Sequence, residues 1–172
     1  AQAPGITAGT NPAILHAAIV TTVNRVVGVY EKEVSIRMIL VANNNLIEFL
    51  DAASDPFNGN NNANVLINES QTIIDANILP ANYDIGHMFG ASGGGGNAGC
   101  IGCVCVNGSK GSGITSPFDG IPQRDNFDID YVAHEIGHQL GGNHTFSHSL
   151  EGTGVNKEVG SGITVMGYAG IT

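Results

Sequence analysis

Apolar side chains recur at intervals of three and four residues along two stretches of the chain, and this spacing is typical of one face of an α-helix. The first stretch covers residues 14–30. It follows Asn11 and Pro12, which favour a helix start because Asn caps the first turn and Pro fits its first position. The second stretch covers residues 64–78 and ends before Pro80, which cannot continue a helix. Both stretches predict amphipathic helices.

A different periodicity follows the first helix, where apolar residues alternate with polar ones. Val34, Ile36 and Met38 would all point to one face of a β-strand. Turn-forming asparagines and glycines separate this segment from further short apolar runs. We predict strands at residues 34–40, 46–50, 83–89 and 104–106, a third helix at residues 128–140, a flexible loop at the glycines 93–96, and further loops at residues 55–62 and 107–125. This mixture predicts an α+β protein.

The composition excludes several classes of protein. A length of 172 residues fits one domain, or two small lobes that share a cleft. Six Lys and Arg residues against 15 Asp and Glu residues give a net charge of -9, so the chain has no basic surface for nucleic acid. The best candidate for a membrane span, residues 17–30, is shorter than the roughly 18 apolar residues required and is broken by Asn24 and Arg25.

The amino-acid composition also suggests a cellular location. Charged residues make up only 12% of the chain, and 25 residues are glycine. No signal peptide opens the sequence, so the chain is either cytosolic or already processed. A low charge content with many glycines is typical of secreted proteins, and we therefore expect a secreted, extracellular protein.

The strongest chemical signal lies at the end of the third predicted helix. His134 and His138 are four residues apart, so both imidazoles would project from one face of that helix and reach one metal ion. Glu135 would lie beside the metal, where it can hold a water molecule instead of coordinating. Gly141 permits the left-handed turn that reverses the chain and returns His144 as the third ligand.

Three imidazole ligands indicate a catalytic zinc ion. They leave the fourth position open to water, whereas structural zinc sites are closed by four protein ligands. The ion keeps its full charge and lowers the pKa of the bound water towards 7. Glu135 would accept a proton from this water as it attacks a carbonyl carbon, and would later pass the proton to the leaving amine. The pattern therefore predicts a zinc-dependent endopeptidase.

Residues 134–144 complete the pattern H-E-x-x-H-x-x-G-x-x-H, which resembles the signature of the metzincin zinc metallopeptidases. Met166 follows His144 in the segment Thr164-Val165-Met166-Gly167-Tyr168, which resembles the Met-turn of that family. Three further segments are similar to the adamalysin/reprolysin-like branch, in particular its secreted bacterial members: residues 82–89, 98–105 and 130–133.

The chain also departs from that branch. Thr145 follows the third histidine, where adamalysins have Asp, and this is more similar to the pappalysins. Tyr168, two residues after the methionine, resembles the tyrosine of astacins and pappalysins. In those families the tyrosine approaches the metal and stabilises the oxyanion of the reaction. An ordinary packed aromatic ring is the alternative for Tyr168.

The resemblance implies a metzincin fold: a twisted mixed β-sheet with long helices, an active-site helix, and a short lower lobe that contains the Met-turn. Residues 1–141 would form the upper subdomain, and residues 142–172 would begin the lower one. The family has a strand before its first long helix and a helix after the Met-turn. We therefore expect a chain truncated at both ends, which is monomeric and belongs to a longer protein with a pro-segment or further domains.

The resemblance also implies roles for single residues. Gly141 and Met166 would be structural, with Met166 forming the floor under the zinc ion. The partner would be an extended protein or peptide substrate, which adds a strand to an exposed sheet edge. We expect this edge at residues 83–91, with substrate contacts at His87, Met88, Phe89, Gly90 and Ala91.

Three cysteines lie within six residues, and an odd number excludes a self-contained disulfide framework. Cys100 and Cys103 form a C-x-x-C pattern, which suits a redox pair, half of a zinc knuckle, or a buried cysteine whose partner lies outside the chain. Cys105 matches a cysteine typical of the resembling family. Its partner is expected in a C-terminal part of the protease beyond residue 172.

Two questions stay open in the sequence. The acidic residues Asp119, Asp125, Asp128 and Asp130 could hold calcium or cap the active-site helix, although they lack an EF-hand pattern. A zinc-bearing recognition or surface module that no longer cuts peptides is the alternative to a protease. A metallohydrolase of non-peptide amides is a third reading, because the motif determines the chemistry better than the substrate.

Overall fold

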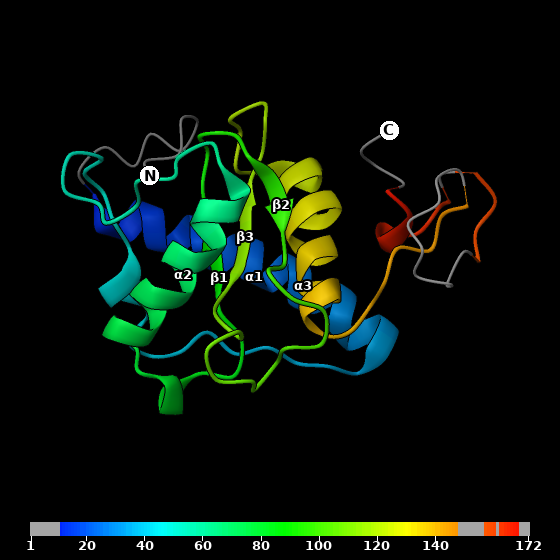
Figure 1. Ribbon diagram of the computed structural model, residues 1–172, viewed down its shortest axis with the longest axis horizontal. Helices are drawn as coiled ribbons and strands as arrows, with labels where there is room; N and C mark the ends of the chain where they lie inside the picture. The colour runs from blue at the N-terminus through cyan, green and yellow to red at the C-terminus, as the bar shows by residue number, and fades with distance from the viewer. Residues whose placement is uncertain (1–10, 148–156, 161, 169–172) are drawn as a thin grey trace.

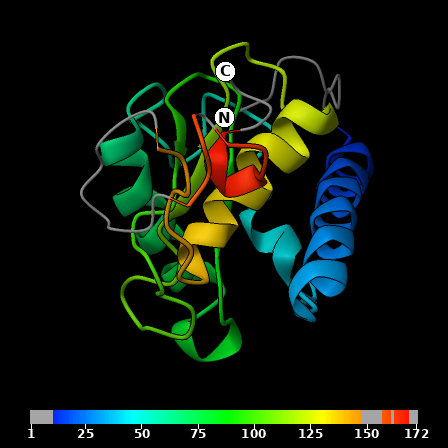
Figure 2. The same ribbon diagram turned by 90° about the vertical axis from the view of Figure 1, so that its right-hand side faces the viewer.

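A computed structural model of the chain describes residues 11–147, 157–160 and 162–168. A small sheet lies in the middle of the molecule (Figure 1). Helix α2 (Ala63–Asn77) covers one face of this sheet, and helices α1 (Pro12–Val34) and α3 (His134–Gln139) lie on the other (Figures 1 and 2). The predicted α+β class, with a mixed sheet and long helices, is confirmed.

Helix α1 begins as predicted. The side chain of Asn11 accepts a 3.0 Å hydrogen bond from the N–H of Ala13, and Pro12 occupies the first helical position. The helix ends at Val34, and the C-cap residue Ser35 has a left-handed φ of 58°. By length and composition α1 could cross a membrane, a property that it shares with core helices of soluble proteins and with signal sequences. Arg25 of this helix pairs with Asp128 at 2.6 Å.

The strands predicted at residues 34–40 and 46–50 are wrong. Residues 35–41 have no regular structure, and Asn44–Ile47 form a 3₁₀ turn. The alternation still describes which side chains face inward, since Ile36 and Met38 are half-buried while Ile39 is 81% exposed. A strand also needs a hydrogen-bonding neighbour, and among the described residues none pairs with this segment.

Helix α2 is present where the sequence predicted it. The side chain of Asn62 caps the first turn by accepting a hydrogen bond of 3.1 Å from the N–H of Asn64. The buried face of the helix packs on the sheet through Leu66, which contacts Met88 and Ile114. Pro80 begins a short 3₁₀ turn, Pro80–Asn82, after the helix.

The sheet is formed by β1 (His87–Phe89), β2 (Gly95–Asn97) and β3 (Gly113–Ser116) in the order β1-β3-β2. Strand β1 runs parallel to β3, and β2 runs antiparallel to it with Gly96 opposite Thr115. Three predictions fail here. The central strand β3 lies in the predicted loop 107–125, β2 includes two glycines of the predicted flexible loop, and residues 104–106 form no strand.

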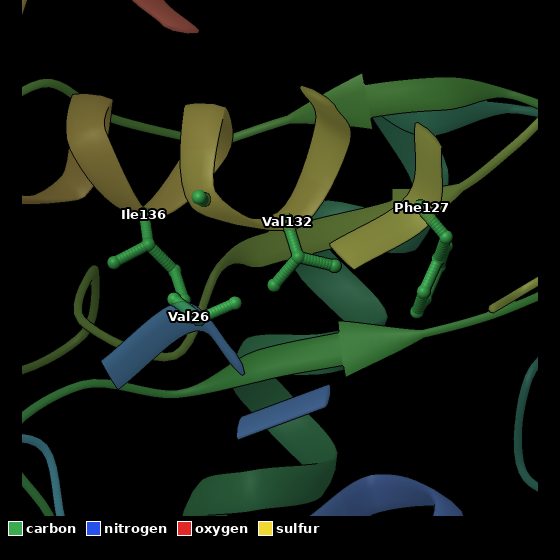
Figure 3. Packing of buried hydrophobic residues seen from close by; sticks show 5 residues of the cluster. Val26, Phe127, Val132 and Ile136 are labelled. Atoms are coloured by element: carbon green, nitrogen blue, oxygen red, sulfur yellow. The ribbon is translucent and has the colours of Figure 1, made fainter. Parts of the chain in front are cut away.

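The third predicted helix is continuous in space but has two parts. A π-helical segment, Asn126–Ala133, leads directly into α3. Figure 3 shows Val26 of α1 facing Phe127, Val132 and Ile136 along one side of this helix. All four side chains are buried, so this contact holds the helix against α1.

Candidate metal centre and active site

His134 and His138 come from the first and second turns of α3 and point to the same place. Both are buried, with 2% and 7% of their surface exposed. His144 joins them from the segment after the helix. The Nε2 atom of His144 lies 3.0 Å from that of His134 and 3.0 Å from that of His138. The Nε2 atoms of His134 and His138 are 3.1 Å apart. The three histidines that the sequence motif predicted to share one metal ion therefore meet in the folded structure.

Hydrogen bonds at the opposite ring nitrogens orient two of these rings. The Nδ1 atom of His134 lies 2.7 Å from the carbonyl oxygen of Val165, and that of His138 lies 2.7 Å from the carbonyl oxygen of Gly142. A carbonyl accepts hydrogen bonds only, so Nδ1 carries the proton in both rings and Nε2 presents a lone pair. Backbone partners of this kind are typical of histidines that bind metals.

The chain reversal after α3 depends on glycine, as predicted. Gly141 has a φ of 108°, a left-handed conformation that residues with a side chain rarely adopt. Its N–H donates to the carbonyl of His138 at 2.9 Å, and the N–H of Gly142 donates to the carbonyl of Gly137 at 2.8 Å. These two bonds close the end of the helix and direct the chain towards His144.

Met166 and Tyr168 lie next to the histidines, in and just after a 3₁₀ turn, Val165–Gly167, that is seen beside α3 in Figure 2. The Met166 sulfur packs on Gly137, since a Cβ atom at position 137 would lie 2.5 Å from it. The ring of Tyr168 is stacked on His134 with centroids 5.0 Å apart, and its centroid lies 4.6 Å from that of His144.

The three histidines fit a zinc ion. The Nε2 atoms of His134, His138 and His144 converge on one point, where the lone pairs of His134 and His138 would repel each other, and a shared cation turns this arrangement into an attractive one. Of the His, Cys, Asp and Glu side chains in the described part of the chain, these three form the group that could hold a metal ion.

Comparison with known families agrees with this geometry. The model of the family described as "Metallo-peptidase family M12B Reprolysin-like" matches residues 4–172. The chain belongs to this family. It is therefore a zinc metallopeptidase, and the resemblance to the reprolysin-like metzincins is confirmed. A search of curated proteins finds no match.

In this reprolysin-like chain, Glu135 lies beside the three histidines that could hold the metal ion. Burial raises the pKa of its carboxyl group to about 8, and a hydrogen bond from the backbone of Ala98 acts in the opposite direction. A bound cation would favour the charged carboxylate. Gly96 of β2 lies directly against this side chain. The sequence predicts a flexible loop at Gly96 and a family-like segment at Ala98 but no contact of either with Glu135, because only the pairing of β2 with β3 brings them there.

A cleft borders the histidines. Its walls come from Asn97 at the end of β2, from the segment that follows, including Ile101, and from Glu135, Asn143 and Tyr168. The five residues predicted to contact substrate do not line this cleft. His87, Met88 and Phe89 form β1, on the other side of β3, and both Met88 and Ala91 are buried.

His87 has a structural environment instead. Its Nδ1 atom lies 2.9 Å from the side-chain oxygen of Gln139, and its Nε2 atom lies 2.9 Å from the hydroxyl of Thr115. Gln139, which is fully buried, also donates to the carbonyl of Gly86 at 3.0 Å. These bonds join the end of α3 to β1 and β3. The sequence contains no local signal for them, since position 139 is a variable position of the zinc motif.

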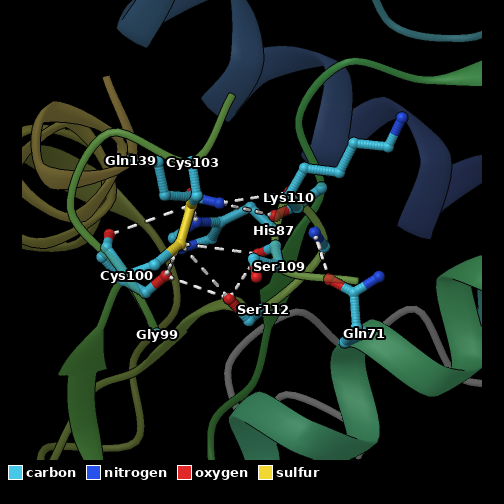
Figure 4. The surroundings of a disulfide bond; sticks show 12 residues. Gln71, His87, Gly99, Cys100, Cys103, Ser109, Lys110, Ser112 and Gln139 are labelled. Carbon is cyan, nitrogen blue, oxygen red and sulfur yellow. Dashed lines mark hydrogen bonds between the residues drawn. A yellow bond between two sulfur atoms is a disulfide. The ribbon is translucent and has the colours of Figure 1, made fainter. Parts of the chain in front are cut away.

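The cysteines divide into a pair and a single thiol. Cys100 and Cys103 form a disulfide, which Figure 4 shows beside Gln139 and Ser112. The zinc-knuckle reading of the C-x-x-C pattern is therefore wrong. Cys105 carries a free, exposed thiol, in agreement with the expectation that the three cysteines do not all pair with one another. Its partner beyond residue 172 stays a prediction.

The acidic residues before the zinc motif do not form a calcium site in the described part of the chain. Asp125 and Asp128 both pair with Arg25, and Asp128 also accepts a 2.7 Å hydrogen bond from Thr22. The alternative, capping of the helix, is not observed either, because Asp125 makes no side-chain cap hydrogen bond. The carboxylates of Asp125 and Asp128 are instead paired with Arg25 of α1.

Proposed function

We propose that this chain is the catalytic part of a zinc-dependent endopeptidase that cuts extracellular proteins. One observation carries the proposal: the Nε2 atoms of His134, His138 and His144 converge to within 3.1 Å of one another while Glu135 lies beside them in the same cleft. A metal site of three imidazoles with an adjacent carboxylate that is not a ligand suits hydrolysis.

The zinc ion, Glu135 and Tyr168 would have different roles in the reaction. A zinc ion, when bound, supplies a Lewis acid and lowers the pKa of water. Glu135 would accept the proton of the attacking water and pass it to the leaving amine, a role that suits a carboxyl group which lines the cleft beside His138 and His144. Tyr168, stacked on His134, would place its hydroxyl near the developing oxyanion.

The substrate would lie extended along β2. This strand is at the edge of the three-stranded sheet, and its residues 96 and 97 line the cleft beside the histidines. Strand addition at such an edge gives main-chain hydrogen bonds to any sequence. The position of the cleft therefore supports Gly95–Asn97 as the pairing edge, in place of the segment that begins at His87.

An oxidising location agrees with the cysteine chemistry. The disulfide between Cys100 and Cys103 would be reduced in most cytosolic environments, whereas it persists outside the cell. The low share of charged residues, 12%, is also typical of secreted chains. Both observations support an extracellular enzyme.

The experiment replaces Glu135 with Ala in the zinc-loaded protein. We expect cleavage of casein or gelatin to be lost while one zinc ion per chain is retained, measured by atomic absorption after gel filtration. Glu31→Ala is the control, because this exposed glutamate of α1 lies outside the cleft, and it should cleave at the parent rate. Cleavage by Glu135→Ala at the parent rate would refute the mechanism. A parent protein that binds zinc and cuts nothing would indicate a recognition module.

A further inference from the structure

The loop closed by the disulfide projects an apolar side chain into the active-site cleft. Ile101 lies between Cys100 and Cys103 and lines the same cleft as His138 and His144. Although it is apolar, 56% of its surface is exposed. A bulky apolar side chain that is left exposed beside a reaction centre is available for contact with a ligand.

This loop is held against the end of the active-site helix. The N–H of Gly102 donates to the carbonyl oxygen of His138 at 2.9 Å, and the N–H of Cys103 donates to that of Gln139 at 3.0 Å. Gly102 and Gly141 also approach closely, because a Cβ atom at position 102 would lie 3.7 Å from the Gly141 Cα atom. Figure 4 shows the disulfide packed beside Gln139. The position of Ile101 is therefore tied to that of the zinc ligands.

The direction of the chain connects Ile101 to the substrate edge. Strand β2 ends at Asn97, and residues 98–101 continue from it along the wall of the cleft. A peptide paired with β2 would pass this wall on leaving the strand. Apart from Glu135 and the histidines, the described residues that line the cleft are uncharged. An apolar substrate side chain would therefore contact Ile101. A charged substrate side chain would find no residue of opposite charge beside Ile101 among the described residues of this wall.

We propose that Ile101 is a specificity-determining residue, which contacts an apolar side chain of the substrate a few residues from the scissile bond. The inference rests on the proposed endopeptidase function and adds the class of side chain that the cleft selects. The disulfide and the two backbone hydrogen bonds keep the contact at a constant distance from the zinc ligands. Because the side chain is exposed, substitutions at this position do not disturb the core.

The experiment compares the parent protein with Ile101→Lys and Ile101→Ala on a library of peptides, all zinc-loaded. Ile39→Lys is the matched control, since Ile39 is also exposed, at 81%, and lies outside the cleft. We expect the parent to prefer an apolar residue at one substrate position. Ile101→Lys should lower kcat/KM about tenfold for those peptides, mainly through KM, and raise it for peptides with Asp or Glu there. Ile101→Ala should weaken the apolar preference without creating the acidic one.

A second readout is independent of turnover. Binding of the preferred peptide and of its acidic analogue is measured by fluorescence anisotropy in a Glu135→Ala background, where Ile101→Lys should invert the order of affinity. An unchanged peptide preference in both assays would overturn the inference. An equal loss of kcat on every peptide would also overturn it, because the loop would then act on the catalytic groups. If the parent cuts no peptide, the proposed function itself fails.

Discussion

Gly96 of the edge strand lies so close to Glu135 that a Cβ atom at position 96 would be 2.7 Å from the Cγ and Cδ atoms of the glutamate. Strand β2 therefore forms one wall of the space in which this carboxyl group is held. The absence of a side chain at position 96 lets the strand approach the Glu135 carboxyl group directly. Substrate paired with β2 would then lie within reach of Glu135.

Gly96→Ala tests this contact. The added methyl group must displace the Glu135 side chain, and we expect kcat to fall about tenfold to a hundredfold, since small displacements of catalytic groups have effects of that size. The zinc content should remain one ion per chain. Steady-state kinetics together with metal analysis would check both expectations. An alanine variant with parent kcat would show that Glu135 can act from another position.

Metal removal should lower both stability and activity. Zinc that binds only to the folded chain stabilises it by about 2.7 kcal/mol at a free concentration 100 times its Kd. We expect a chelator to lower the melting temperature and to abolish cleavage, and added zinc to restore both. In His138→Ala the chelator should have little further effect. Calorimetry with and without chelator would measure this, and an identical melting temperature in the parent protein would contradict the metal site.

The central strand should tolerate no side chain at Gly113. A Cβ atom there would lie 2.5 Å from the Nδ1 atom of His87 and 2.6 Å from the Cδ atom of Gln139, and this Nδ1 atom is hydrogen-bonded to the Oε1 atom of Gln139. We expect Gly113→Ala to lower the free energy of unfolding by about 1–3 kcal/mol. Gly28→Ala is the control, because nothing lies within 4 Å of that position in α1. It should raise stability by up to about 1 kcal/mol.

Both variants can be compared by urea denaturation at one pH. A Gly113→Ala protein as stable as the parent would mean that His87 and Gln139 can move apart without loss. A destabilised Gly28→Ala protein would mean that α1 has a contact at position 28 that the described structure lacks.

The stability of the fold should depend on pH through His87. Burial lowers the pKa of this side chain from 6.5 to about 4, and the bond with Gln139 acts in the opposite direction. Between these two values the unfolded chain binds a proton that the folded chain does not, so stability falls as the pH drops from 6.5 to 4, by up to about 3 kcal/mol, and this contribution changes no further below pH 4. Urea denaturation at pH 7.5, 5.5 and 4.5 would measure the loss.

His87→Gln supplies the comparison for this pH dependence, because glutamine keeps a polar side chain but does not titrate. The variant should lose less stability than the parent over the same pH interval. Parallel loss in the two proteins would assign the acid sensitivity to other groups, such as the zinc-binding histidines.

Tyr168→Phe separates the two readings of Tyr168. Phenylalanine keeps the ring that is stacked on His134 and tilted against His144, and it removes only the hydroxyl group. If the hydroxyl stabilises the oxyanion, kcat should fall about tenfold to a hundredfold with little change in KM. Unchanged kinetics with unchanged melting temperature would leave Tyr168 as a packed aromatic residue.

The sequence by itself determined the features that depend on local spacing. His134 and His138 face one metal because four residues make about one helical turn, and Gly141 reverses the chain because glycine accepts a left-handed φ. The starts of α1 and α2 follow in the same way from the caps Asn11 and Asn62. These features were predictable because the interacting groups lie within one or two turns of chain.

Only the tertiary structure decided which segments pair and which residues meet at the cleft. Residues 35–41 carry a strand pattern but pair with no strand in the described part of the chain, whereas the glycine-rich Gly95–Asn97 forms a strand because β3 provides its hydrogen bonds. The contact of Gly96 with Glu135 and the position of Ile101 depend on this pairing. Hydrogen bonds between strands distant in sequence leave no periodicity in the chain, so no local pattern could have placed them.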